Sequence, residues 1–134
     1  MRIRLLTGAM MLDLRVLPER LSVCRLPAGS ELPGWAAAGG FCSVSWTSEE
    51  TSIVCVEAAV PGDVRSEGGW RALMVAGPLD FDLTGILASV AQPLADASIS
   101  IFAISTFDTD YVLVRNSALD RAMEVLRAWG HRVG

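Results

Sequence analysis

Apolar and polar residues alternate along several short segments of the chain, and this alternation predicts β-strands. In residues 11–17, leucine and valine side chains alternate with Asp13 and Arg15, a period of two that is typical of a half-buried strand. Residues 18–20, which begin with a proline, are expected to separate this strand from the next one. The same criteria predict further strands over residues 21–26, 41–47, 52–57, 70–76, 99–105 and 111–115.

Two other segments have the spacing of an amphipathic helix. In residues 83–95 the apolar side chains fall on one face, and Pro93 is expected to loosen the last turn. At the second helix, Ser117 and Asp120 predict a capping box, and Gly130 predicts the C-terminal end. The apolar stripe of this second helix consists of Leu119, Ala122, Met123, Leu126 and Trp129.

The second half of the chain therefore has the order strand, helix, strand, strand, helix, with a short strand predicted over residues 131–133. This order predicts a ferredoxin-like α+β unit, an antiparallel sheet with both helices on one face. The first half lacks a good first helix, because the glycines and prolines of residues 27–40 leave room for one or two helical turns only. Residues 61–69 predict a linker, which divides the chain into a first unit over residues 1–64 and a second over residues 65–134.

A strand, a Ser/Thr-rich acidic turn and a Val-rich strand occur twice, in residues 41–56 and 99–114. When the two segments are aligned on Thr47 and Thr106, the second copy is expected to be one residue shorter in the turn. An internal repeat and a chance pair of similar hairpins are equally good interpretations of this pattern.

Composition narrows the possible classes of protein. The chain has 134 residues, of which 51% are hydrophobic and 19% are charged, and this apolar fraction excludes a disordered chain. Its net charge of −4, with scattered arginines and no basic stripe, argues against binding nucleic acid or an anionic membrane surface. No apolar run is long enough to span a membrane. The mean hydropathy of +0.42 is high for a monomer, so we expect a homodimer.

Cysteine and histidine usage indicates an intracellular, non-catalytic protein. Cys24, Cys42 and Cys55 form no CxxC motif and lie in apolar contexts, which predicts reduced, buried thiols and a cytoplasmic location. The apolar run near the N-terminus is too short for a signal peptide and is followed by Asp13. The one histidine, His131, is expected at the surface, so we predict no metal site, no cofactor and no nucleophile–base pair.

The start of the first predicted helix is one candidate ligand site. The first amides of a helix lack intrahelical partners and lie at the positive end of its dipole, so they can hold a carboxylate. The candidate residues are Asp82, Thr84, Gly85, Ile86 and Leu87. The alternative is that Asp82 or Thr84 only caps the helix.

The two acidic turns are the other candidates. In the second turn, two carboxylates and several hydroxyls could hold an ammonium group through charge-assisted hydrogen bonds. These residues are Ser105, Thr106, Asp108 and Asp110, and the counterparts in the first turn are Ser48 and Glu49. The alternative for both turns is an ordinary solvated hairpin, in which Ser, Thr and Asp are common.

Two segments, GPLDFDLTGIL over residues 77–87 and ISTFDTDYVLV over residues 104–114, resemble the ACT-domain family, specifically its small tandem-ACT proteins. The resemblance is strong over residues 70–130 and extends more weakly to the first half, through SVSWTSEETSIVCV in residues 43–56. The same group is similar to aspartokinase regulatory domains and to ACT-built arginine sensors.

This resemblance implies a pair of ferredoxin-like ACT units that binds a small molecule, usually an amino acid, without transforming it. The ligand would lie at a junction of units, near the loop that joins the first strand to the first helix. Its carboxylate would meet the amides of Gly85, Ile86 and Leu87, and its ammonium would meet Asp108 or Asp110. The alternative function is a ligand-free interaction module that acts through oligomerisation or a protein partner.

Overall fold

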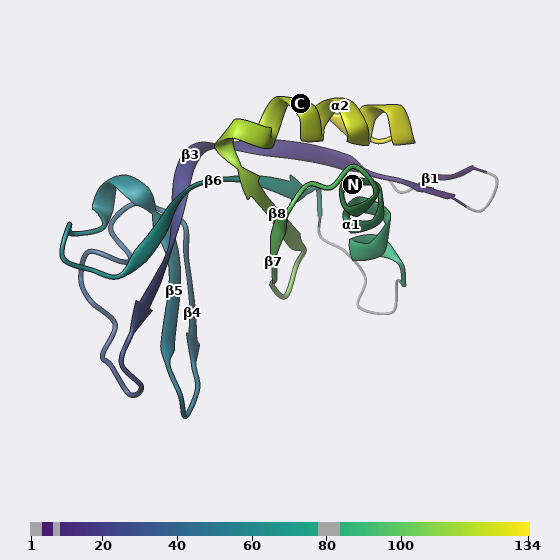
Figure 1. The fold of residues 1–134 in the computed structure, drawn as a ribbon. Helices are drawn as coiled ribbons and strands as arrows, with labels where there is room; N and C mark the ends of the chain where they lie inside the picture. Colours follow the sequence, from purple (N-terminus) through teal and green to yellow (C-terminus); the bar gives the residue numbers. More distant parts are fainter. Residues whose placement is uncertain (1–3, 7–8, 78–83) are drawn as a thin grey trace. The chain divides into compact units, whose positions relative to one another are not determined.

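A computed structural model describes residues 4–6, 9–77 and 84–134. The chain forms two compact units, and we describe each by itself. Unit 1 consists of Met1–Pro18 and Arg71–Gly134, and unit 2 consists of Glu19–Trp70. Two long strands, β3 (Asp13–Leu26) and β6 (Ser66–Val75), contribute one end to each unit (Figure 1).

Unit 1 is a sheet covered by two helices. Its strands follow the order β3-β6-β8-β7, where β7 is Ile101–Ser105 and β8 is Asp110–Arg115, an antiparallel pair. The short strand β9 (Arg132–Val133) pairs in parallel with the start of β3. A separate two-stranded sheet joins β1 (Arg4–Leu6) to β2 (Ala9–Met11).

The helices α1 (Ile86–Asp96) and α2 (Leu119–Trp129) pack on one face of this sheet. Alternate residues of the central strands point toward them, as the period of two requires. The resulting core includes Leu73 and Val75 of β6, Val112 and Val114 of β8, Val90 and Leu94 of α1, and Ala122 and Leu126 of α2.

Unit 2 is a smaller sheet of order β4-β5-β3-β6, in which β4 is Cys42–Trp46 and β5 is Thr51–Val56. All of its residues are described, and they include no α-helix, only the 3-10 turn η1 (Glu57–Ala59). Its core is formed by Cys24, Ala36, Ile53 and Cys55, with Trp35, Val60 and Val64 packed against it. Turns and loops therefore pack on the core of unit 2 in place of α-helices.

The structure corrects several local predictions. The strands predicted on either side of residues 18–20 form the single strand β3, because the restricted φ of Pro18 suits an extended chain and only one backbone donor is lost. The predicted linker ends earlier than expected, since β6 begins at Ser66. The capping box is absent: Ser117 lies in the 3-10 turn η2 (Asn116–Ala118), and α2 begins after Ala118 without a side-chain cap. Gly130, at φ 114°, ends α2 as predicted.

His131 was expected at the surface but is 4% exposed. Its Nδ1 accepts a hydrogen bond from the Leu12 amide at 3.0 Å, and its Nε2 lies 2.8 Å from the Ser89 carbonyl oxygen. Because an amide only donates and a carbonyl only accepts, these contacts select the neutral ring with the proton on Nε2. The polar ring is buried at no loss of hydrogen bonding.

The compact units also differ from the predicted division at residues 64 and 65. Residues 1–18 group with the second half of the chain, because β9 and the core of unit 1 contact the start of β3. The sequence also predicts two tandem ACT-like units with a boundary between residues 64 and 65. That boundary stays a prediction.

Candidate functional site

The start of α1 offers backbone donors to a ligand. Gly85 is the N-cap residue and has a φ of +78°, a left-handed conformation that glycine adopts without strain. Its carbonyl accepts the first bond of the helix, from the Ser89 amide at 2.9 Å. Within the described ranges, no side chain caps the amides of Gly85, Ile86 or Leu87. The first amides of a helix have no intrahelical partners and lie at the positive end of its dipole.

The side chains around these amides differ in exposure. Thr84 and Gly85 are exposed, Leu87 is half-buried, and Ile86 is buried in the core. The apolar side chains thus anchor the first turn while its backbone stays near the surface. Asp82, the remaining candidate here, lies outside the described residues.

The turn between β7 and β8 is held by its own hydroxyls. The amide of Thr106 donates to the Thr109 carbonyl at 2.8 Å, and the Thr106 hydroxyl donates to the same oxygen at 3.1 Å. Ser105 Oγ donates to Asp110 Oδ1 at 2.6 Å. Asp108 is exposed, and its carboxylate makes no contact with other described residues that would occupy it. Asp108 is therefore the carboxylate of this turn that is free to meet a cation.

Thr109 ties this turn to the rest of unit 1. Its side chain is buried, and its hydroxyl donates to the Val75 carbonyl at 2.5 Å. Val75 is the last residue of β6, the strand from which the chain continues toward α1. The acidic turn and the end of β6 are thus in direct contact. The local pattern around Thr109 marks a turn but gives no sign of this long-range bond.

The turn between β4 and β5 repeats the same hydrogen bonds. The Thr47 amide donates to the Glu50 carbonyl at 3.0 Å, and the Thr47 hydroxyl donates to that oxygen at 3.2 Å. The two turns have equal length, so the prediction of a shorter second copy is wrong. Ser48 and Glu49 are exposed in this turn, which belongs to unit 2. That they meet the start of α1 stays a prediction.

The correspondence extends beyond the turns at a constant spacing of 59 residues. The strands β4 and β7 begin at Cys42 and Ile101, and β5 and β8 begin at Thr51 and Asp110. The 3-10 turns η1 and η2 begin at Glu57 and Asn116.

The three cysteines form a cluster on adjacent strands of unit 2. Cys55 is the register partner of Cys42 and is hydrogen-bonded to Cys24, and all three thiols are free. Burial raises the pKa of all three thiols; it raises that of Cys55 to about 12, with a further contribution from Cys24 and Cys42. A thiol that stays protonated is a poor nucleophile and metal ligand. Over the described part of the chain, no group of three His, Cys, Asp or Glu residues is arranged to hold a metal ion.

None of the described helices has the length and apolar character needed to cross a membrane.

Comparison with known proteins gives two matching family models. One, described as an ACT domain, matches residues 65–128, and the other, described as an N-terminal domain, matches residues 19–63. Among curated relatives, the cytosolic arginine sensor for mTORC1 subunit 1 of Homo sapiens is 46% identical over 59 residues, which are 43% of this chain and 18% of the sensor. The sensor of Mus musculus is 34% identical over 111 residues, covering 72% of this chain and 34% of its own. The chain therefore spans about a third or less of the length of these relatives.

Solved structures agree with the family match. A protein from Agrobacterium tumefaciens is 40% identical, with 92% of each chain covered and a TM-score of 0.87. The aspartate kinase of Clostridium acetobutylicum, 12% identical, covers 96% of this chain and 36% of its own with a TM-score of 0.68, which shows a shared fold. The predicted ferredoxin-like α+β fold is thereby confirmed, and residues 65–128 of the chain belong to the ACT-domain family.

Proposed function

We propose that this chain is a non-catalytic, cytoplasmic regulatory protein that binds an amino acid in unit 1. The carboxylate of the ligand would accept hydrogen bonds from the amides of Gly85, Ile86 and Leu87, and its ammonium would meet Asp108. The observation that carries this proposal is the bond from Thr109 to Val75, which joins the acidic turn to the strand leading into α1. Similarity to arginine sensors supports an amino acid as the ligand class.

Within the acidic turn, the hydrogen bonds distinguish the two candidate carboxylates. Asp110 already accepts a hydrogen bond from Ser105 and lies at the start of β8, whereas Asp108 is exposed at the tip. Asp108 can therefore bind a cation without giving up a bond that holds the turn. An ammonium that pairs with a carboxylate gains a charge-assisted hydrogen bond, which is about twice as strong as a neutral one.

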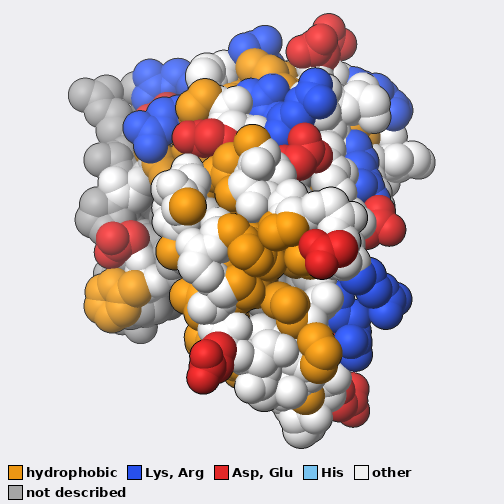
Figure 2. Space-filling model, turned by 90° about the vertical axis from the view of Figure 1, so that its left-hand side faces the viewer, with side chains coloured by type: hydrophobic (Ala, Val, Ile, Leu, Met, Phe, Trp, Pro, Cys, Tyr) orange, Lys and Arg blue, Asp and Glu red, His pale blue; other side chains and the backbone are white. Residues whose placement is uncertain are grey.

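A regulatory role requires that the ligand favour one state of the protein over another, because a ligand shifts an equilibrium only through differential affinity. We propose that the state selected is an association of two copies of the chain. Trp46 in unit 2, and Phe107 and Trp129 in unit 1, are 56%, 79% and 49% exposed. Figure 2 shows hydrophobic side chains at the surface of the side that it draws. The same surfaces would serve the alternative function, a ligand-free interaction module.

A thermal-shift screen against the twenty amino acids tests the proposal. A ligand present at 100 times its Kd adds about 2.7 kcal/mol to the stability of the folded state, which corresponds to several degrees in the melting temperature of a domain this size. The hit should be lost in Asp108→Asn and kept in Asp120→Asn, a matched control at an exposed acid in α2 of the same unit.

Two results would count against the sensor. A shift that persists unchanged in Asp108→Asn would show that the acidic turn does not hold the ligand. If no amino acid shifts the melting temperature and the oligomeric state is constant, the interaction module is the better description.

A further inference from the structure

Unit 2 contains a hollow of about 220 Å³ on one face of its sheet. The residues that line it include Val23 and Arg25 of β3, Ser52 of β5 with Glu50 just before that strand, and Glu67 of β6 with Arg65 just before that strand. Ser52 is the register partner of Arg25, and the Arg25 amide donates to the Arg65 carbonyl at 2.9 Å. Three neighbouring segments thus bring these side chains into one row.

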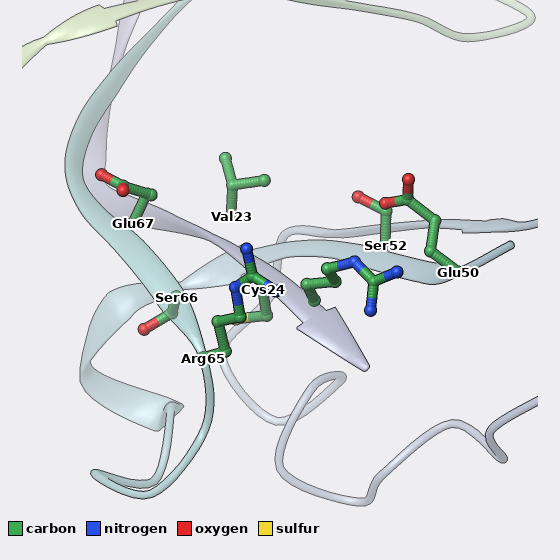
Figure 3. A pocket seen from close by; sticks show the side chains of 8 residues that line it. Val23, Cys24, Glu50, Ser52, Arg65, Ser66 and Glu67 are labelled. Carbon is green, nitrogen blue, oxygen red and sulfur yellow. The ribbon is translucent and has the colours of Figure 1, made fainter. Parts of the chain in front are cut away.

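Cys24 of the thiol cluster also lines the hollow, at its place on β3 between Val23 and Arg25. Val23 and Arg25 alternate with Cys24 along β3, so their side chains point to the opposite face of the sheet. Figure 3 shows Glu50 and Ser52 on one side of β3, and Arg65 and Glu67 on the other. The sequence separates these residues by up to 44 positions, from Val23 to Glu67, and only the register of β3, β5 and β6 brings them together.

The lining carries charges of both signs, from Arg25 and Arg65 and from Glu50 and Glu67. Arg25 uses one Nη2 donor on the Glu49 carbonyl oxygen at 3.1 Å and keeps its other donors. Among the described residues, the guanidinium of Arg65 and the carboxylate of Glu50 form no ion pair. The hollow therefore holds a guanidinium and a carboxylate that are not paired with each other, together with the Ser52 hydroxyl and the apolar Val23 side chain.

A ligand that fits must carry a carboxylate and an ammonium a short distance apart. Arginine donates two parallel hydrogen bonds to a carboxylate, and a glutamate accepts from an ammonium. A pocket for a drug-sized molecule is usually about 300–1,000 Å³, so this smaller hollow suits a single amino acid. We infer that unit 2 holds a second site, for the zwitterion of a free α-amino acid, with its carboxylate on Arg25 and Arg65 and its ammonium on Glu50.

This site does not depend on the one proposed at α1. All its residues belong to unit 2, whereas the α1 start and the β7–β8 turn belong to unit 1. The two sites can therefore be observed and removed separately.

Nuclear magnetic resonance on the full, ¹⁵N-labelled chain tests the second site. The chain is titrated separately with L-alanine, L-aspartate and L-arginine, and the expected result is saturable movement of the Val23, Arg25, Ser52 and Arg65 amide signals with at least one of them. L-Alaninamide and N-acetyl-L-alanine, which each keep one of the two charges, should not bind there. Arg65→Ala and Glu50→Gln should each weaken binding about tenfold or more, because each removes a charge-assisted contact.

Matched controls separate this inference from the proposed function. Arg20→Ala removes an exposed arginine elsewhere on β3 and should leave the titration unchanged. Asp108→Asn should abolish movement of signals near α1 while the unit 2 signals still move. The second site is refuted if none of the three amino acids moves the unit 2 signals, or if Arg65→Ala and Glu50→Gln bind as tightly as the unaltered chain.

Discussion

At the scale of single residues, the buried cysteines of unit 2 fill its apolar core. Cys24 and Cys55 are 1% and 0% exposed and touch each other within a core of small apolar side chains. Ionising either thiol would place a charge in this core, which is the physical reason for the raised pKa of both. The folded protein therefore binds the Cys55 proton more tightly than the unfolded chain does.

This difference predicts a pH dependence of stability. The pKa of Cys55 rises from 9.0 to about 12 on folding, because burial disfavours the thiolate. The stability that the folded state owes to the protonated thiol is therefore fully present below pH 9 and is lost between pH 9 and about 12. Over that window the free energy of unfolding should fall by up to about 1.4 kcal/mol per pH unit for this thiol. Urea unfolding under reducing conditions at pH 8 and above measures the slope.

The matched comparison is Cys55→Ala, which lowers stability at every pH but removes the titrating group. Its unfolding free energy should therefore depend less steeply on alkaline pH than that of the unaltered chain. Equal slopes for the two proteins would mean that Cys55 does not titrate in this window.

At the scale of elements, α1 begins after its N-cap residue Gly85, which has a left-handed backbone conformation. A Cβ added at this position would meet nothing within 4 Å, so a substitution there costs strain and not a clash. The left-handed conformation is unfavourable by about 1–2 kcal/mol for residues other than glycine, and asparagine tolerates it better than alanine.

Gly85→Ala should therefore lower the free energy of unfolding by about 1 kcal/mol, and Gly85→Asn by less. Gly34→Ala is the matched control, because Gly34 also has open space around it but has no left-handed φ. Chemical denaturation of the three variants provides the measurement. If Gly85→Ala and Gly34→Ala are equally stable, the left-handed conformation does not limit α1.

The paired turns at Thr47 and Thr106 are also explained at this scale. In each, one threonine uses both its amide and its hydroxyl to bond the carbonyl three residues on. Short polar side chains can satisfy a turn in this way without help from the rest of the fold. This local chemistry is the reason that both turns could be predicted from residue types.

At the scale of the whole molecule, the C-terminal residues of unit 1 hydrogen-bond to residues near the start of the chain. The Arg132 amide donates to the Leu12 carbonyl at 2.9 Å, and the Gly134 amide donates to that of Leu14 at 3.0 Å. His131 adds the link between the Leu12 amide and the Ser89 carbonyl, and thereby joins β9, β3 and α1.

His131→Ala should lower the free energy of unfolding by about 1–3 kcal/mol, because it leaves a buried amide and a buried carbonyl without partners. The control Arg132→Ala removes an ion pair to Asp13 at 2.5 Å, in which the arginine side chain is 60% exposed. An exposed pair contributes about 0–1 kcal/mol. Thermal or urea unfolding compares the two variants, and an Arg132→Ala loss as large as that of His131→Ala would contradict this account.

The sequence by itself determined the class of the fold, most of the element positions and the residues of both acidic turns. Alternation along 41–47, 52–57 and 111–115 identified strands that the structure places within one or two residues, because side-chain periodicity is a local property. The amphipathic stripe and Gly130 identified α2 for the same reason.

Tertiary structure alone decided which distant residues meet. The continuity of β3 through Pro18, the burial of His131 and the bond from Thr109 to Val75 all depend on partners far away in the sequence. The same holds for the row formed by Arg25, Ser52 and Arg65 in unit 2. Strand register sets these contacts, and register follows from the packing of the whole sheet, which no local pattern of residue types contains.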